Sequence, residues 1–160
     1  METIPESVEN FAKIARRYCE WAEAERGDPD DEMVVAREIL AELHLAIIRL
    51  PNLGFDDDDD QDEVTWSADE WRKIRDSFRD LPVQGHWDVF DPLVEEAPVF
   101  NTLGDDLADI YADLKDGLAH HDAGRIGSAV WEWRFSFSTH WGRHLTSAQR
   151  AIYAHFFNQY

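Results

Sequence analysis

The sequence has 160 residues, a length suited to one domain that buries about 70% of the surface its unfolded chain would expose. It is strongly acidic, with 34 aspartates and glutamates, 15 lysines and arginines, and a net charge of −19. Such a charge repels nucleic acids and anionic membranes, and it attracts basic proteins and cations.

We expect no signal peptide and no membrane span. The first residues lack a basic stretch followed by an apolar one, and the longest apolar runs are too short to cross a bilayer. A single cysteine excludes an intrachain disulfide. We therefore expect a cytoplasmic protein with a single helical domain, residues 1–160, and no membrane or nucleic-acid partner.

The first fifty residues predict two helices. A capping box at Thr3–Glu6, with proline in the first turn, predicts a helix that starts there and ends near Arg26–Gly27. Asp28–Pro29 is typical of a second helix start, and Pro51 predicts its end. Because the connection is short, the two helices should pack antiparallel.

An acidic segment follows at residues 52–65, with five consecutive aspartates at Asp56–Asp60. A block of like charge stays solvated, so we expect a flexible loop. A calcium-binding loop is the alternative. However, an EF-hand requires glycine at its sixth position, and Gln61 occupies that position here.

A third helix is predicted from a capping box at Ser67–Glu70 to Pro82. Residues 84–102 then predict a long loop with one short turn at His86–Phe90. We expect this loop to pack onto the domain because it contains several large apolar side chains: Trp87, Phe90, Leu93, Val99 and Phe100. A packed loop of this length is often functional.

Thr102 predicts the start of a fourth helix, and Gly124 predicts its end. One face of this helix is apolar and should be buried. The opposite face carries a row of carboxylates at three- and four-residue spacing: Asp106, Asp109, Asp113 and Asp116. We interpret this row as a solvated acidic face.

The segment Val130–Leu145 is the richest in aromatic residues: Trp131, Trp133, Phe135, Phe137 and Trp141. Its apolar positions fall three or four apart, which is typical of a helix face. Five buried aromatic side chains would contribute about 25 kcal/mol before entropy is counted. We predict a central buried helix beginning near Ile126–Ser128, and a separate last helix beginning at a capping box, Thr146–Gln149.

These elements predict an all-α fold, a single bundle of five to six helices with a long packed loop between helices three and four. Three segments resemble the bacterial family called domain of unknown function 5063: Ser7–Trp21, Trp87–Leu118 and Val130–Leu145. The most distinctive part is Trp-Glu-Trp-Arg-Phe with the following His-Trp-Gly. The resemblance implies a small helical protein, and it implies no catalytic residue because the activity of the family is not established.

Asp105, Asp106 and Asp109 form an Asp-Asp-x-x-Asp motif at the start of the fourth helix. On a helix, this spacing places two carboxylates on one edge, where they can share Mg²⁺ and hold a diphosphate. Glu38 and Glu42 are a possible partner set on the second helix. We favour the alternative, an acidic surface whose charges stabilise the helix N-terminus.

His140 and His144 lie one helical turn apart. Such a pair binds zinc or iron when a carboxylate from another helix completes the site. Glu132 is too far along the same helix to share an ion with both histidines. We therefore expect hydrogen-bonded histidines at the edge of the core, and no metal cofactor.

Charged side chains also interrupt the aromatic segment, and buried charges need partners. Glu132 and Arg134 should therefore meet partners, and the candidates in the long loop are Asp88, Asp91, Glu95 and Glu96. One interpretation is a salt-bridge network that clamps the loop. The other is a binding pocket for an anion or a peptide, formed by Arg134, His140 and Arg143 with Glu132 and Trp87.

Nucleophilic catalysis has no support, because Cys19 has no histidine nearby in sequence and no Gly-x-Ser-x-Gly motif occurs. We favour a non-enzymatic binding or regulatory module whose acidic surface meets a basic protein, for example an immunity-type inhibitor. The alternative is a Mg²⁺-dependent hydrolase of a phosphorylated small molecule that uses Asp105, Asp106 and Asp109.

Overall fold

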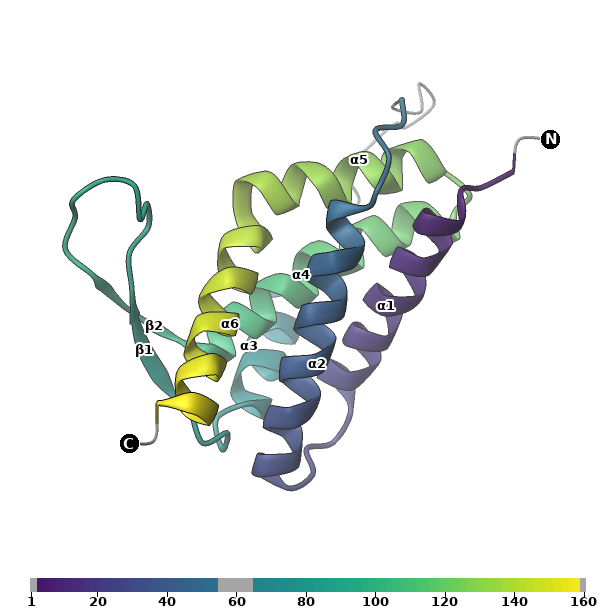
Figure 1. Ribbon diagram of the computed structural model, residues 1–160. Coiled ribbons are helices and arrows are strands. Elements are labelled where there is room, and N and C mark those ends of the chain that lie inside the picture. Colours follow the sequence, from purple (N-terminus) through teal and green to yellow (C-terminus); the bar gives the residue numbers. More distant parts are fainter. Residues whose placement is uncertain (1–2, 55–64, 159–160) are drawn as a thin grey trace.

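The structure, a computed structural model, describes residues 3–54 and 65–158. Helices packed side by side form the body of the molecule, and a β-hairpin lies at one edge (Figure 1). The elements are α1 (Glu6–Glu23), α2 (Pro29–Ile48), α3 (Ala68–Ser77), β1 (Gly85–Asp88), β2 (Val99–Thr102), α4 (Leu103–Asp122), α5 (Ile126–Ser136), the π-helical turn η1 (Phe137–Trp141) and α6 (Gly142–Phe157). The predicted all-α bundle is confirmed, with a small hairpin added to it.

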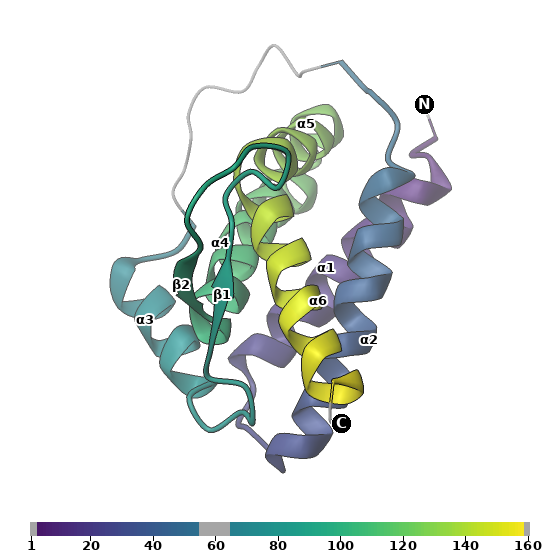
Figure 2. The ribbon, with the colours of Figure 1, turned by 60° about the vertical axis from the view of Figure 1, so that its left-hand side comes forward.

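Most of the predicted acidic loop at 52–65 lies outside the described residues, which resume at Thr65. The described helices include none that is long and apolar enough to cross a membrane. The predicted antiparallel pairing of the first two helices is confirmed, because α1 and α2 pack together on the side of the bundle away from the hairpin (Figure 2).

Helix α4 is the centre of the bundle, in place of the aromatic segment that we predicted. It packs against α1, α3, α5 and α6. Leu107, Ala108 and Ile110 are fully buried, as are Tyr111 and Leu114. The single cysteine, Cys19, is buried in α1, and desolvation raises the pKa of its thiol to about 12.

Only part of the aromatic segment is buried. Trp133 and Trp141 have no exposed surface, whereas Trp131 and Phe135 are 40% and 50% exposed. The rings of Trp131 and Phe135 stack on each other with centroids 4.8 Å apart. The prediction of five buried aromatic side chains was therefore wrong, because the inward face of α5 is only wide enough to bury one stripe.

Trp133 occupies a closely fitted site between α5 and the middle of α4. Its indole N–H donates to the Leu114 carbonyl over 3.2 Å, and its ring lies 4.8 Å from that of Phe11. Gly117 lies directly beneath the indole, and a Cβ atom at this position would come within 2.0 Å of Trp133 Nε1. The close packing of α5 on α4 therefore requires a glycine at position 117.

The aromatic segment also bends. The π-helical turn η1 separates α5 from α6, and the two helices meet at a steep angle (Figure 1). A Cβ atom on Gly142 would lie 2.3 Å from the Phe137 carbonyl oxygen, so glycine permits the bend. The predicted helix start at Thr146 was wrong. The Thr146 hydroxyl donates to the carbonyls of Gly142 and Arg143 inside a continuous α6 and caps no helix.

Three of the predicted helix starts are confirmed by their caps. The side chains of Asp28, Ser67 and Thr102 accept hydrogen bonds from backbone N–H groups in the first turns of α2, α3 and α4. The start of α1 differs, because Pro5 precedes the helix and no side chain caps it. Helix α1 also ends three residues earlier than predicted, where the Arg26 guanidinium donates to the Ala24 carbonyl.

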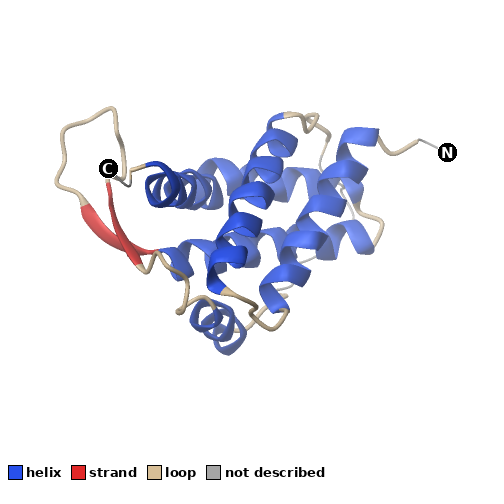
Figure 3. Ribbon diagram, turned by 60° about the horizontal axis from the view of Figure 1, so that its bottom comes forward, coloured by secondary structure: helices blue, strands red, loops and turns tan. Residues whose placement is uncertain are grey.

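The loop predicted to pack onto the bundle instead forms the β-hairpin. Strands β1 and β2 are antiparallel, with Trp87 opposite Phe100. The connecting loop extends away from the helices (Figure 3), and Leu93 near its tip is 92% exposed. The two strands satisfy each other's backbone hydrogen bonds, and the connecting loop contacts α6 through Phe90, which lies beneath the Arg143 guanidinium.

Replacement of Trp133 by alanine should reduce the free energy of unfolding by about 3–5 kcal/mol, because it empties a fully enclosed site. The matched control is Trp131→Ala on the same helix, whose partly exposed indole should cost only about 1 kcal/mol. Urea denaturation followed by circular dichroism measures both values. Equal losses in the two variants would contradict the difference in burial described above.

Candidate metal centre

The carboxylate row of α4 is covered by other elements, contrary to the predicted solvated face. Asp106 is 1% exposed, and the side chains of Asp109 and Asp113 are 23% and 16% exposed. Helices α3 and α6 and the turn η1 all pack against α4 on this side. A buried carboxylate requires hydrogen-bond or ionic partners, and each member of the row has them.

Two histidines lie above this row. His140 Nδ1 is 2.7 Å from Asp113 Oδ2, and His144 Nδ1 is 2.8 Å from Asp106 Oδ1. In a neutral imidazole whose Nδ1–H donates to a carboxylate, the Nε2 lone pair is free for a metal ion. Both histidines of the His-x-x-x-His pair therefore use Nδ1 for α4 and leave Nε2 as the potential ligand atom.

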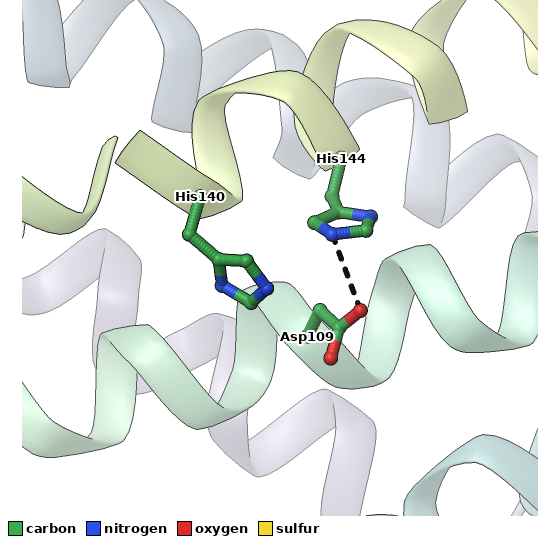
Figure 4. Close-up of side chains that lie close together, drawn as sticks. All are labelled: Asp109, His140 and His144. Atoms are coloured by element: carbon green, nitrogen blue, oxygen red, sulfur yellow. Dashed lines mark ion pairs between the residues drawn. The ribbon is translucent and has the colours of Figure 1, made fainter. Parts of the chain in front are cut away.

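Asp109 lies between the two histidines, and the three side chains point toward one another (Figure 4). Asp109 Oδ2 is 3.3 Å from His144 Nε2. The other carboxylate oxygen, Oδ1, accepts a hydrogen bond of 3.0 Å from the Trp71 indole, which fixes the orientation of the carboxylate. Asp109 is the carboxylate from another helix that the sequence analysis could not identify.

The distances between the three ligand atoms suit a small cation if the side chains move slightly closer together. One ligand atom each from Asp109, His140 and His144 lies within 4.8 Å of the other two. A tetrahedral zinc ion with bonds of about 2.0–2.1 Å holds its ligands about 3.4 Å apart. The His140 side chain is 42% exposed, so it has room to make the required movement.

The position of His140 depends on the π-helical turn. His140 lies within η1 and His144 in the first turn of α6, so both follow directly from the bend after α5. This bend brings α6 against the N-terminal half of α4, where Asp106 and Asp109 contact His144. Single π-helical turns inside α-helices are frequent at functional sites.

The buried Asp106 also contacts the hairpin. Its second oxygen, Oδ2, lies 2.8 Å from His86 Nε2 on β1. Beside His144, the hairpin covers a cavity of about 70 Å³, lined by Asp88, Phe90, Val99, Asn101, Asp106, Arg143, His144 and Ser147. The buried Ser147 hydroxyl has no hydrogen-bond partner among the described residues, and a cavity of this size has room for water or a small ligand group.

Burial and charge shift the proton affinities within the cluster. Desolvation raises the pKa values of Asp109 and Asp113 despite the histidines beside them. Burial opposes protonation of His144, but the hydrogen bond to Asp106 and the charge of Asp109 outweigh it, so the pKa of His144 is also raised. Burial therefore disfavours the charged forms of Asp109 and Asp113, whereas the negative charge of Asp109 favours protonation of His144.

The residues that we predicted as a binding site are dispersed. Only His140 belongs to the cluster, and Arg143 borders the cavity, with its guanidinium 4.2 Å above the Phe90 ring. Arg134 was expected to pair with the loop but donates to the Leu50 carbonyl beyond α2. Glu132 is half-buried on α5, and Trp87 is 70% exposed on β1.

The three carboxylates of the Asp-Asp-x-x-Asp motif do not lie together either. Asp106 and Asp109 face the histidines, whereas Asp105 is 42% exposed and lies 4.0 Å from the Arg75 side chain. No sequence pattern assigns a role in the site to Trp71, His86 or Asp113. The carboxylate row and the His-x-x-x-His pair both have helical spacing, and this spacing is the sequence feature that points to the arrangement. It does not reveal which helices face each other.

A model of the family described as domain of unknown function (DUF5063) matches residues 2–158 of this sequence. The chain belongs to this family. The resemblance noted from the aromatic segment and from two other segments is therefore confirmed, and the family description assigns no activity.

No functionally curated protein matches the sequence. Among solved structures, the crystal structure of protein BF1032 from Bacteroides fragilis is similar, with a TM-score of 0.81 and 20% sequence identity. The alignment covers 97% of this chain and 95% of that chain. At this identity, the likeness shows that the two proteins share a fold and says nothing about their sites.

The raised pKa of His144 predicts a pH-dependent stability of the metal-free protein. The folded state binds this proton more tightly than the unfolded state, so the stabilising contribution is complete below the ordinary histidine pKa of 6.5 and is lost as the pH rises through the raised value. In EDTA, the free energy of unfolding should fall as the pH rises above 6.5. Urea titrations should show a smaller fall in His144→Gln, and identical pH profiles would contradict this assignment.

Proposed function

We propose that this protein binds a divalent transition-metal ion through Asp109, His140 and His144, and that the bound ion activates water for hydrolysis. The observation that supports this most strongly is the convergence of three ligand atoms from α4, η1 and α6. Imidazole nitrogens favour zinc, iron, copper and nickel, and Zn²⁺ suits a set of two nitrogens and one oxygen.

The surrounding hydrogen bonds support a metal site. Each histidine has an acidic partner at Nδ1, and the Asp109 carboxylate is oriented by Trp71. Metal-bound histidines commonly have this kind of carboxylate partner, which sets the tautomer and increases the basicity of the ligand. Asp106 and Asp113 are therefore proposed to position the ligands without binding the ion.

Three protein ligands leave one position of a tetrahedral ion for water, as in catalytic zinc sites. A bound zinc ion lowers the pKa of such a water to about 7, so hydroxide is available near neutral pH. The exposed side of His140 leaves the centre accessible, and Arg143 at the nearby cavity provides a positive charge for an anionic substrate group. We therefore retain hydrolysis of a phosphorylated small molecule as the reaction class.

The proposal replaces the Mg²⁺ site considered from the sequence. Mg²⁺ prefers octahedral oxygen ligands, whereas the cluster offers two imidazoles. The motif that suggested Mg²⁺ is divided, since Asp105 faces Arg75 instead of the histidines.

The acidic charge supports a second function, the binding of a basic protein, which does not require the metal. This is the regulatory module that the sequence favoured. The net charge of −19 supports it, together with the apolar surface of the hairpin, on which Leu93 is 92% exposed. An acidic protein attracts basic partners over long range.

The metal proposal predicts one tightly bound Zn²⁺ per chain in isothermal titration calorimetry. Asp109→Asn, His140→Ala and His144→Ala should each abolish tight binding, and Asp113→Asn should weaken it about 10–100-fold. At a zinc concentration of 100 times Kd, the wild-type protein should gain about 2.7 kcal/mol, which corresponds to about 5–10 °C in Tm.

The matched control is Asp105→Asn, which removes a neighbouring carboxylate of α4 from outside the cluster and should leave zinc binding unchanged. An equal loss of zinc binding in Asp105→Asn and Asp109→Asn would favour a site formed by the Asp-Asp-x-x-Asp motif. Saturable binding of Mg²⁺ in preference to Zn²⁺ would overturn the choice of ion.

The hydrolytic part of the proposal is tested with 4-nitrophenyl phosphate. Zinc-loaded protein should release 4-nitrophenol faster than zinc in buffer, with a rate that rises as the bound water ionises near about pH 7. His144→Ala should lose this activity, and Asp105→Asn should keep it. A protein that binds zinc but shows no turnover would restrict the ion to a structural role.

A further inference from the structure

Large apolar side chains are exposed together on the β-hairpin and its connecting loop, residues 85–102, which we call the hairpin arm. They are Trp87 (70%), Phe90 (66%), Leu93 (92%), Val94 (56%), Val99 (52%) and Phe100 (60%). Single exposed apolar residues are normal on a protein surface, but a contiguous group of them marks an interaction site.

The hairpin arm is held at its base, it contacts α6 through Phe90, and its connecting loop extends away from the helices (Figure 1). At the base, the Leu103 N–H donates to the Gln84 carbonyl over 3.1 Å, and His86 contacts the buried Asp106. Farther out, Trp87 and Phe100 pack edge to face with centroids 5.5 Å apart. The loop then extends away from the helices (Figures 1 and 3). A two-stranded hairpin alone is marginally stable in water, so a partner that buries the apolar side chains would stabilise the arm.

The charge around these side chains indicates the chemistry of that partner. The arm carries four acidic residues, Asp88, Asp91, Glu95 and Glu96, and the sequence contains no lysine or arginine between Arg79 and Lys115. A second copy would bring the same acidic arm to a protein with a net charge of −19, which is unfavourable. The same repulsion disfavours nucleic acids and anionic membranes.

One contact within the molecule shows how a cation can bind to an aromatic ring of the arm. The Arg143 guanidinium of α6 lies 4.2 Å above the centre of the Phe90 ring. Aromatic faces attract guanidinium and ammonium groups, and the attraction increases where water is excluded. The exposed rings of Trp87 and Phe100 offer the same type of contact to an outside partner.

We propose that the hairpin arm docks a segment of another protein in which lysines or arginines alternate with apolar anchor residues. The anchors would cover the apolar side chains of the arm, and the basic residues would meet its carboxylates. This inference rests on the second proposed function, names the surface for it, and is independent of the metal centre.

The test uses three synthetic peptides of equal length and the full protein. The first is an amphipathic lysine–leucine peptide, the second replaces its lysines by glutamate, and the third replaces its leucines by serine. Calorimetry should show that the first binds at least about tenfold more tightly than either of the others, with weaker binding as salt rises. Equal binding of the lysine–serine peptide would overturn the proposal, because charge alone would then explain it.

The location is tested with paired variants. Leu93→Ser/Val94→Ser changes the tip of the arm and should weaken binding of the lysine–leucine peptide at least about tenfold. Leu45→Ser/Ile48→Ser removes two apolar side chains that are 51% and 67% exposed on α2, and it should leave binding unchanged. Both variants alter exposed positions, and thermal melts verify that they fold.

Three results would assign the arm to another role. Equal losses in the two paired variants would remove the site from the arm. A dimer in sedimentation equilibrium that Leu93→Ser/Val94→Ser dissociates would identify a second copy as the occupant, and binding to phosphatidylcholine vesicles through the same residues would identify a membrane. His144→Ala should retain peptide binding, so failure of the metal proposal can be distinguished from failure of this one.

Discussion

Burial of the carboxylate row on α4 is the constraint on which the arrangement of the other elements depends. Asp106 is 1% exposed and lies between His86 and His144, while Asp109 contacts Trp71 and His144. Farther along the row, Asp113 contacts His140. Asp116 accepts hydrogen bonds from Thr65 and Trp66. A buried charge without partners destabilises a fold by several kcal/mol. The partners therefore have to come from α3, the hairpin, η1 and α6, and the row connects these elements to the centre of the bundle.

A purely structural role explains this arrangement incompletely. Apolar side chains of similar volume would pack α6 on α4 without the desolvation penalty of carboxylates and imidazoles. Desolvation raises the pKa values of Asp109 and Asp113, because burial disfavours their charged forms. A divalent cation between Asp109 and the two imidazoles would bring positive charge to these buried carboxylates. The desolvation of these polar groups thus reduces the stability of the fold, which is typical of functional sites.

The metal centre and the hairpin arm are neighbours, although the first is buried and polar and the second is exposed and apolar. His86 at the base of the arm contacts Asp106, whose other oxygen holds His144. One side of the molecule therefore combines a buried polar cluster with a projecting apolar surface. The opposite side is formed by α1 and α2 (Figure 2), and the buried side chains of these two helices are apolar or aromatic, with Cys19. Function is expected on the first side, where a polar cluster is buried and the large apolar side chains of the arm are exposed.

The sequence by itself determined the local features of this protein. Asp28, Ser67 and Thr102 define helix starts because a cap depends only on neighbouring residues, and the apolar spacing indicates the helices. Only the tertiary structure decided that the α4 carboxylates are buried, that the aromatic segment bends at η1, and that the loop forms a projecting hairpin. The metal centre belongs to this second group. Asp109 and His140 are distant in sequence, and their meeting depends on which helix faces meet, which spacing within either segment does not specify.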